Sequence, residues 1–268
     1  MRNTQRRVMH LRVRTRNTSC EPLKHLIVPK RTIYRMGSET PLEKITRRTD
    51  YLEINTPEGC KTSGDKILMK QKFIENNIPT AEYATINSDE TREAFKERLH
   101  GLFADWKRVI IKHKHSSKGN GIYFADSIEA LDEWLARNNP ANHIFEKYYT
   151  YSKEYRLHVD DTDGCFYTCR KMLKNDAEVR WHRHENNSVW ILEENELFDK
   201  PNNWDNIVED CVRAIHAVGL NIGAVDIKVQ THRDNPKYII LETNSAPALG
   251  EIGIEKYKEA LINYINNH

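Results

Sequence analysis

Two acids and an amide near the end of the chain are placed where they could bind a cation. Residues 238–241 form an apolar run that predicts a buried strand, and Glu242 and Asn244 follow before a proline-containing turn. Because side chains alternate faces along a strand, Glu242 and Asn244 point to the same side. A second apolar run, 222–229, carries the single acid Asp226. If the two strands pair as neighbours, these three side chains form one cluster of oxygen donors.

Such a cluster suits Mg²⁺, which prefers hard oxygen ligands and usually shares them with substrate phosphates. Mn²⁺ could take the same place. The alternative for either acid alone is structural, with Asp226 ending a strand and Glu242 pairing with a lysine. The spaced set favours a cation, because an isolated buried acid is costly and two together need a positive partner.

A second group of residues has the chemistry to hold phosphates. Lys112 ends a predicted strand, and the sequence Ser-Ser-Lys-Gly-Asn-Gly follows at 116–121. Glycine permits positive φ and a close approach of the backbone, so that amide N–H groups can face a phosphate. Lys66 opens a second predicted element, an amphipathic helix over 67–74 with Ser or Asp as its cap. A triphosphate with Mg²⁺ needs fixed positive charge, which two lysines on separate elements could supply.

Length and composition indicate a folded protein with a large core. The chain has 268 residues, of which 38% are hydrophobic and 30% charged, within the globular range. No apolar run approaches the ~20 residues that a membrane helix needs, so we expect no membrane partner. The five cysteines are odd in number and scattered, as expected for reduced thiols, and we predict a cytoplasmic protein.

Charge is unevenly distributed along the chain. Residues 1–48 hold 13 Lys and Arg and 3 Glu, a net charge of +10, and the remaining 28 Lys and Arg and 36 Asp and Glu give −8. Within this segment, residues 9–16 alternate apolar and basic side chains, which predicts an exposed or edge strand. The basic segment could bind a polyanion such as nucleic acid, or an acidic peptide. Alternatively, it packs on the acidic body of the same chain.

The remaining patterns complete a mixed chain of helices and strands. A strand over 143–148 precedes two strands, 153–159 and 165–171, that flank Asp-Asp-Thr-Asp-Gly, a strong hairpin signal. The polar stretch 174–188 resembles a mobile loop. Helices are predicted over 88–100, over 127–137, over 205–218 with Asp205 as the cap, and over 253–265.

Taken in order, these pieces resemble the ATP-grasp superfamily over about residues 64–250. The matching elements are Asp65-Lys66 opening a helix, Lys112 before a glycine-rich loop, Glu146-Lys147-Tyr148, Glu154, and the set Asp226, Glu242 and Asn244. The resemblance implies an α+β fold in which two lobes, each an antiparallel sheet with helices, clamp ATP between them. It divides the chain into a reduced N-terminal α/β segment (1–63), an ATP-grasp N-terminal lobe (64–147) and a C-terminal lobe (148–268).

The resemblance also implies roles for individual residues. Glu146, Lys147 and Tyr148 match the hinge that meets adenine, and Glu154 matches the acid that holds the ribose. The two lysines and the glycine-rich loop complete the cofactor-binding set: Lys66, Lys112, Ser117, Gly119 and Gly121. Asp226, Glu242 and Asn244 match the Mg²⁺ ligands. The candidates to stabilise the transferring phosphoryl group are Arg156, Arg170 and Lys171, although adjacent strand residues face opposite ways, so only one of the last two should do so.

Within the superfamily, residues 154–159 and the short front end are most similar to the RimK-like amino-acid ligases, of which compact versions occur in bacteriophages. Two features depart from that branch. Only 65 residues precede Lys66, where most members carry a substrate-binding domain of roughly 100 residues. The stretch 180–187 stands where that branch usually has an Arg, an Asn and paired glycines. Both departures concern the acceptor rather than ATP.

The reaction that the resemblance implies is an ATP- and Mg²⁺-dependent joining of a carboxylate to an amine. Phosphoryl transfer to the carboxylate gives an acyl phosphate, and the amine then attacks to form an amide. The acceptor would be an amino acid, a peptide or a protein. Two alternatives remain open at this point: a kinase of the same fold, and a nucleotide-regulated module that binds nucleic acid through the basic residues 1–48, which we favour less.

Overall fold

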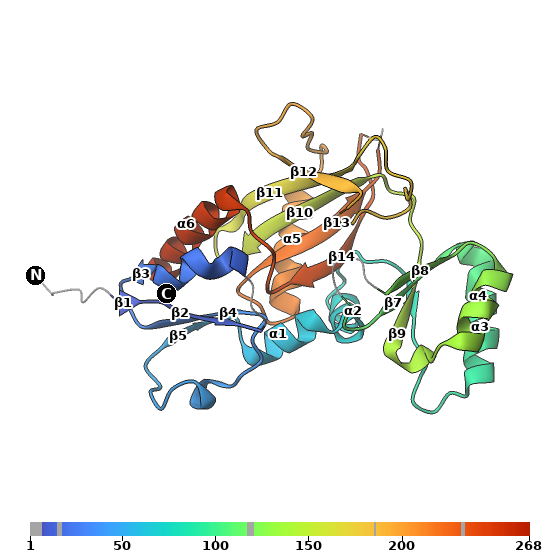
Figure 1. Ribbon diagram of the computed structural model, residues 1–268, viewed down its shortest axis with the longest axis horizontal. Helices are drawn as coiled ribbons and strands as arrows, with labels where there is room; N and C mark the ends of the chain where they lie inside the picture. The colour runs from blue at the N-terminus through green and yellow to red at the C-terminus, as the bar shows by residue number, and fades with distance from the viewer. Residues whose placement is uncertain (1–6, 15–17, 117–120, 185, 232–233) are drawn as a thin grey trace, which may run out of the picture.

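The computed structural model of the chain describes residues 7–14, 18–116, 121–184, 186–231 and 234–268. Two antiparallel sheets lie beside each other in the middle of the molecule (Figure 1). A smaller N-terminal unit packs at one end, and helices α3 (Arg92–Trp106) and α4 (Ile128–Arg137) lie at the opposite end. The chain is therefore a mixed α/β structure with antiparallel sheets, as the sequence predicts.

The larger sheet has five strands in the order β12-β11-β10-β13-β14, each antiparallel to its neighbours. The hairpin that the sequence predicts is present as β10 with β11, and the two predicted strands near the end of the chain, β13 and β14, do pair as neighbours. The strands are β10 (Lys153–Asp160), β11 (Gly164–Leu173), β12 (Ser188–Leu192), β13 (Ile222–Val229) and β14 (Tyr238–Asn244).

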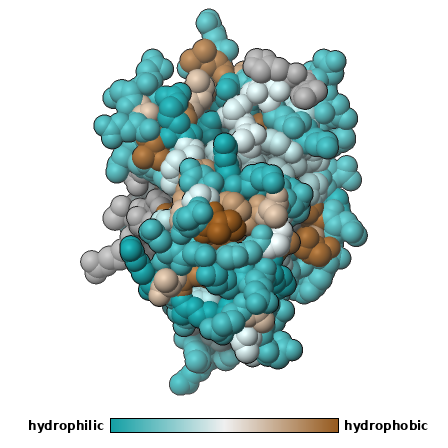
Figure 2. All heavy atoms as spheres, turned by 90° about the vertical axis from the view of Figure 1, so that its right-hand side faces the viewer, coloured by the Kyte–Doolittle hydropathy of each residue, from teal (hydrophilic) through white to brown (hydrophobic). Residues whose placement is uncertain are grey.

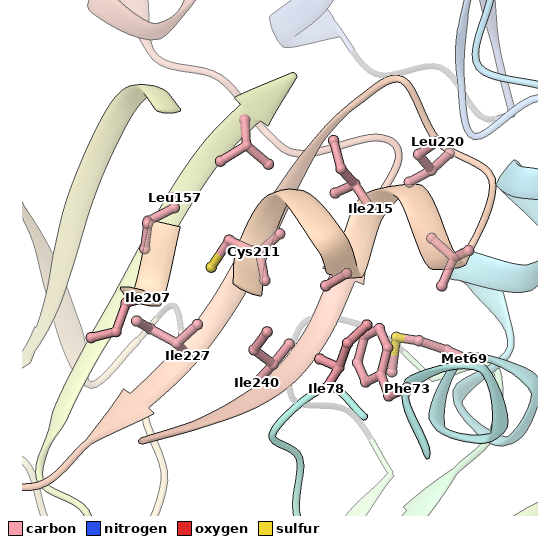
Figure 3. Close-up of a cluster of buried hydrophobic side chains, with 14 of the residues drawn as sticks. Met69, Phe73, Ile78, Leu157, Ile207, Cys211, Ile215, Leu220, Ile227 and Ile240 are labelled. Carbon is pink, nitrogen blue, oxygen red and sulfur yellow. The ribbon is translucent and has the colours of Figure 1, made fainter. Parts of the chain in front are cut away.

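Helix α5 (Trp204–Ala217) covers one face of this sheet and forms the main core with it (Figure 3). Helix α1 (Pro57–Gly64) packs beside α2 (Lys66–Glu75), whose Met69 and Phe73 continue the same core. Each buried side chain of this size stabilises the fold by about 1.5–3 kcal/mol. The side chains that meet between α5 and the sheet include Ile207, Cys211, Ile215, Leu157, Ile227 and Ile240.

The smaller sheet has four strands in the order β6-β9-β7-β8. Helices α3 and α4 cover one face of it and bury a second core, with Phe95 and Leu99 of α3 against Val109 and Phe145 of the sheet. A short 3-10 turn, η3 (Pro140–Asn142), leads into β9. The strands are β6 (Tyr83–Ala84), β7 (Val109–His113), β8 (Ile122–Ala125) and β9 (His143–Lys147).

The N-terminal unit combines a parallel sheet with a short antiparallel pair. Strands β2 (His10–Val13), β4 (Thr32–Met36) and β5 (Leu52–Ile54) are parallel, and β1 (Arg7–Val8) pairs with β3 (Ile27–Val28). The turns η1 (Thr18–His25) and η2 (Leu42–Lys44) flank them. This unit shares an apolar core with helix α6 (Glu251–Asn267), where Leu23, Tyr34 and Met36 join Tyr257 and Leu261. The basic segment therefore docks on the body of the chain through apolar contacts.

Polar residues stand at the N-terminal ends of helices α2 and α5. Asp65 caps α2 as predicted, because its side chain accepts hydrogen bonds from Ile67 N (2.9 Å) and Leu68 N (3.2 Å). The predicted cap of α5 is wrong by two residues, since Asn203 occupies the N-cap position. Asp205 instead lies in the first turn, where a negative charge favours the positive end of the helix dipole.

None of the helices in the described ranges is both long and apolar enough to cross a bilayer. The face at the α3–α4 end is mainly hydrophilic, and its hydrophobic residues form small separate patches (Figure 2). Scattered apolar residues of this kind are normal on a protein surface and do not mark an interface.

Candidate active site

Three charged residues form a row across the larger sheet. Arg156 of β10 lies opposite Asp226 of β13, and Asp226 lies opposite Glu242 of β14. Residues directly opposite each other on neighbouring strands point to the same face of a sheet. Because the apolar residues between them face α5, the three charged side chains project from the other face. Asn244 follows on that face, opposite Ala224. The three predicted oxygen donors are thus neighbours in the sheet.

Arg156 binds Asp226 through a two-pronged ion pair. Its Nε and Nη2 atoms donate to Oδ1 and Oδ2 of Asp226, each at 2.7 Å. Burial alone would raise the pKa of Asp226, but the adjacent guanidinium outweighs burial and lowers it. The guanidinium also lies 4.8 Å from the ring centre of Trp190 on β12. Arg156 therefore holds Asp226 ionised and in a fixed orientation.

Glu242 and Asn244 remain open to a cation. The Glu242 side chain is 37% exposed and its Oε2 lies 3.7 Å from Nζ of Lys66. Asn244 Oδ1 accepts a hydrogen bond from Ala246 N at 2.9 Å, which leaves it a second lone pair. Within the described ranges, no three His, Cys, Asp or Glu side chains are grouped so as to hold a metal ion. Two acids and an amide fit Mg²⁺ only with further oxygens from phosphate or water, which is how proteins usually bind it.

The next row along the same face is built around Glu154. Lys171 of β11 and Lys228 of β13 are its direct neighbours in the sheet. Nζ of Lys171 lies 3.8 Å from one carboxylate oxygen of Glu154, and Nη1 of Arg183 lies 3.5 Å from the other. Burial raises the pKa of Glu154 and lowers that of Lys228 to about 8. Three cations thus surround one acid, in the place where the sequence suggests a ribose-binding residue.

The facing side of the smaller sheet presents a second buried ionic group. Lys112 of β7 donates a hydrogen bond to Oε2 of Glu146 on β9 at 2.6 Å, and Lys70 of α2 lies 3.6 Å from Oε1. Burial alone would raise the pKa of Glu146, but the charges of Lys112 and Lys70 outweigh it and lower the pKa to about 2. Burial lowers the pKa of Lys70 to about 8. Glu146 is therefore an anion that holds two lysines.

Side chains from both sheets meet between these rows. Lys66 donates a hydrogen bond to Ser116 O at 2.5 Å, beside the smaller sheet, and approaches Glu242 of the larger one. Phe124 of β8 stacks on Trp181 with ring centres 5.1 Å apart and meets Tyr148 edge-on at the same distance. The Tyr148 hydroxyl donates to Trp181 O at 3.2 Å. The loop that carries Trp181, predicted as mobile, is thus attached to both sheets.

We call the charged side chains that these contacts connect the inter-sheet cluster. In the described part of the chain it contains seven cations and four acids, a net charge of +3: Lys66, Lys70, Lys112, Arg156, Lys171, Arg183 and Lys228 against Glu146, Glu154, Asp226 and Glu242. An unbalanced positive charge in a partly buried place is costly without an anion. The arrangement is therefore suited to a multiply charged anionic ligand.

The chain is similar to known proteins at the level of solved structures. No family model matches it, and no curated protein matches it. Solved structures do match. D-alanyl-alanine synthetase A from Vibrio cholerae O1 biovar eltor aligns with a TM-score of 0.63 and 15% identity, over 88% of this chain and 76% of that one. D-alanine–D-alanine ligase from Bacillus anthracis, complexed with ATP, aligns with a TM-score of 0.61 and 9% identity, over 88% and 79%.

A third similar structure is that of a protein described as an ATP-grasp ligase. The ATP-grasp ligase PsnB, complexed with minimal precursor, Mg and ADP, aligns with a TM-score of 0.58 and 17% identity, over 81% of this chain and 62% of that one. The chain has the ATP-grasp fold. Its two antiparallel sheets are the two lobes, and the inter-sheet cluster lies between them. At these identities the likeness establishes the fold alone.

The ATP-grasp fold does not bring every predicted residue to this place. Arg170 points to the opposite face of the sheet, where its guanidinium donates to Leu197 O at 2.7 Å and pairs with Asp199. Of the adjacent pair, only Lys171 faces the inter-sheet cluster, and we withdraw Arg170 from the catalytic set. The side chain of Lys147 also turns away, to Glu82 at 2.7 Å, because it lies on the face of β9 next to Phe145 rather than Glu146. The backbone N–H of Lys147 also donates to Glu82 O, at 2.9 Å.

The glycine-rich loop is described only at its end. Ser117 and Gly119 lie outside the described residues. Gly121 has a φ of +65°, and a side chain there would adopt this conformation only with strain. It lies next to Ser116 and His113, immediately before β8. Gly121 is thus placed at the end of β7, next to the residue that follows Lys112.

Four residues of the site were missed in the sequence. Lys228 is two positions beyond Asp226 on one strand, so the alternation of side chains could have identified it. Lys70 is four positions after Lys66 on α2, one helical turn away. Arg183 and Trp190 gave no usable signal, because a loop residue and an edge-strand aromatic acquire their position only from tertiary contacts. These four residues add three positive charges and an aromatic wall to the site.

Proposed function

We propose that the chain is an ATP- and Mg²⁺-dependent ligase that joins a carboxylate to an amine. The observation that carries this proposal is the inter-sheet cluster, which has a net charge of +3 and includes two acids on neighbouring strands, Asp226 and Glu242. MgATP carries a charge of about −2 and presents both phosphates and a cation, so it complements both parts of the cluster. The likeness to ligases that bind ATP, or ADP with Mg, supports this choice of ligand.

Residues from both lobes would bind the nucleotide. Lys66 and Lys112 would bind the phosphates, because their ammonium groups lie at the inner surface of the smaller lobe. Glu154 would accept hydrogen bonds from the ribose after Arg183 moves from its carboxylate. Tyr148 and the backbone of Lys147 would line the base, next to Phe124. Closure of the two lobes would then exclude water from the phosphates.

Asp226, Glu242 and Asn244 would hold Mg²⁺, or Mn²⁺ in its place. The ion would neutralise the charge that develops on the phosphates during transfer. Arg156 orients Asp226 through its two hydrogen bonds and so acts as a positioning residue. Lys171, one row away on the same face, is placed to stabilise the transferring phosphoryl group.

The reaction that these positions would support has two steps. A carboxylate oxygen of the first substrate attacks the γ-phosphorus of ATP, and the bond to the β-phosphate oxygen breaks to release ADP. An amine nitrogen then attacks the acyl carbon, loses a proton and expels phosphate, which leaves an amide. The cations around the phosphates would stabilise both the acyl phosphate and the departing phosphate. An amino acid or a peptide would serve as acceptor, in line with the precursor bound in the PsnB structure.

One experiment tests this function directly. The protein is incubated with ATP, Mg²⁺ and the amino acids singly and in pairs, and phosphate release is measured together with the mass of the products. We expect phosphate to appear with an equal amount of a new amide. A stable phosphoester without free phosphate would instead identify a kinase of the same fold. Binding of MgATP without turnover for any amino acid would direct the search to peptide acceptors.

A further inference from the structure

The N-terminal strands carry a line of exposed side chains outside the inter-sheet cluster. Along β1 and β2, the side chains of even-numbered residues are exposed, whereas Met9 between them is buried. We call these exposed residues the basic stripe: Val8, His10, Arg12 and Arg14. This pattern follows from the alternation of side chains along an edge strand. Three of the four are basic or imidazole side chains, and one of them, Arg14, pairs with Glu39 at 3.2 Å.

A surface hollow adjoins the start of the stripe. It has a volume of about 360 Å³ and is lined by Arg7, Val8, His10, Arg31 and Tyr51. The rings of His10 and Tyr51 meet edge-on with centres 5.6 Å apart and form one wall. A hollow of this volume is at the lower end of the range that binds ligands, and it holds one or two side chains of a peptide. No part of the proposed reaction uses it.

Positive charge exceeds negative charge around the hollow. Arg31 and Arg48 share one acid, Asp50, between them. Partial burial and the neighbouring Arg48 and Arg7 lower the pKa of Arg31. Arginines that repel one another in this way are stabilised by an additional anion. A carboxylate is the group that a guanidinium binds best in two-pronged geometry.

Apolar surface lies next to these charges. Val8 and Ile27 are opposite each other in the β1–β3 pair, and they are 56% and 53% exposed. Two aliphatic side chains do not complement a phosphodiester backbone, and the stacking surface that His10 and Tyr51 offer in the hollow is limited to one edge-on ring pair. The two aliphatic side chains do complement an aliphatic side chain of a peptide. The combination of arginines with aliphatic residues therefore favours an acidic peptide over a nucleic acid.

The stripe leads to the inter-sheet cluster. A Cβ atom on Gly64 would lie 3.2 Å from Nη1 of Arg14, so that guanidinium reaches the end of α1, two residues before Lys66. Gly37, next to Arg14, approaches Ala246 just beyond Asn244. From Val8 to Arg14 an extended strand covers about 20 Å. A peptide of about seven extended residues could therefore bind the hollow at one end and reach the proposed Mg²⁺ site at the other.

We propose that the basic stripe and its hollow bind an acidic, extended segment of a peptide acceptor and present that peptide to the inter-sheet cluster. This inference names the substrate class and rests on the proposed function. The glutamate or aspartate side chains of the segment pair with Arg7, Arg12 and Arg31, and an aliphatic side chain covers Val8. Because the stripe is exposed, its electrostatic attraction is screened over about 10 Å at 0.1 M salt.

The test measures binding without nucleotide, so that it does not depend on catalysis. The probe is a fluorescein-labelled peptide of about twelve residues, long enough to cover the stripe, in which glutamate alternates with valine and serine. A matched peptide carries lysine for every glutamate, and a single-stranded oligonucleotide of similar length serves as a competing polyanion. Fluorescence anisotropy gives the Kd of each at low and high salt.

Charge reversal identifies the binding surface. We expect Arg7→Glu with Arg12→Glu to weaken binding of the acidic peptide by at least about tenfold at low salt. The same charge change at the other end of the molecule, Lys96→Glu with Arg137→Glu, should alter the Kd by less than about twofold. Arg12→Glu alone provides a milder variant if the double variant melts early. Asp226→Asn with Glu242→Gln should leave peptide binding unchanged, which separates this inference from the proposed function.

Three results would overturn the inference. In the first, the wild-type protein binds the lysine peptide as tightly as the glutamate peptide. In the second, the stripe variant keeps both its wild-type melting temperature and its wild-type Kd for the acidic probe. In the third, the oligonucleotide displaces the acidic peptide at a lower concentration than unlabelled peptide does, which would assign the stripe to nucleic acid.

Discussion

Replacing Lys112 by methionine should separate the contribution of this residue to MgATP binding from its contribution to stability. Lys112 and Lys70 share one buried acid, Glu146. The two lysines differ in access, since the Lys112 side chain is 15% exposed and that of Lys70 is fully buried. Either lysine can be removed and still leave Glu146 with a cation. The two substitutions are therefore matched in charge and in chemistry.

The structure sets the expected magnitudes. Breaking a buried ion pair by removing one partner costs about 3–5 kcal/mol when a charge is left alone. After Lys112→Met, Lys70 still lies 3.6 Å from Glu146, so we expect a loss of only about 1–2 kcal/mol. A loss of that size lowers the melting temperature by about 2–8 °C for a chain of this length. Glu146→Gln leaves two lysines without their acid and should therefore be more damaging than either lysine variant.

The effect on nucleotide binding should differ between the two lysines. A charge-assisted hydrogen bond to a phosphate contributes about 1.5–3 kcal/mol, which corresponds to a factor of about 10–150 in Kd. We expect Lys112→Met to weaken binding of a non-hydrolysable MgATP analogue by this factor, and Lys112→Arg to restore it in part, because a guanidinium carries the charge with different geometry. Lys70→Met should change the Kd by less than about threefold.

Isothermal titration calorimetry gives the Kd, and thermal unfolding without ligand gives the change in stability. The two lysine variants should lose similar melting temperature, whereas only Lys112→Met should lose affinity. Equal losses of affinity in both variants would show that the buried group acts as a structural unit. Wild-type affinity in Lys112→Met would remove this residue from the phosphate site.

Three further outcomes follow from the same geometry. MgATP at a hundredfold excess over its Kd should add about 2.7 kcal/mol to the free energy of unfolding and so raise the melting temperature. Asp226→Asn with Glu242→Gln should abolish this rise, whereas Asp89→Asn with Glu93→Gln should retain it. A retained rise in the first variant would show that the two acids are structural. Lys171→Met should slow turnover at unchanged melting temperature. Arg170→Met should instead lower the melting temperature at unchanged nucleotide affinity, because Arg170 binds Asp199 on the other face of the sheet. The reverse result would show that Arg170, and not Lys171, serves the inter-sheet cluster. Nucleotide affinity should fall as pH rises through about 8, because Lys228, whose pKa burial lowers to about 8, then loses the charge that attracts phosphate. Lys228→Met should flatten this titration, and an unchanged pH profile would contradict the role of Lys228.

Local patterns in the sequence predict much of this fold. The apolar runs in 222–229 and 238–241 predict two strands, and the observed register between them places Asp226 opposite Glu242. The Asp-Asp-Thr-Asp-Gly turn predicts the hairpin of β10 and β11. Asp65 caps α2 because its side-chain oxygen reaches the first free amides, an interaction that spans three residues. These predictions succeed because the interactions that decide them are local or repeat with a fixed period.

Predictions that depend on contacts between distant elements were less successful. Alternation shows that Arg170 and Lys171 face opposite sides, but only the pairing of Lys171 with Glu154 shows which of them faces the inter-sheet cluster. Arg183 belongs to a polar stretch that resembles a mobile loop, yet it lies against Glu154, 29 residues away in the chain. Composition could not reveal this contact, because a polar residue that binds a buried acid and one that faces water have the same local sequence signal.

Charge distribution shows most clearly why composition alone is insufficient. Residues 49–268 carry a net charge of −8, which by itself would repel MgATP, yet the inter-sheet cluster within them carries +3. The exposed acids act through water and salt, so they are screened beyond about 10 Å at 0.1 M salt, whereas the partly buried cations act at contact. Salt should therefore affect the two proposed ligands differently. An acidic peptide on the exposed stripe should dissociate as salt rises, and MgATP bound between the sheets should lose much less affinity.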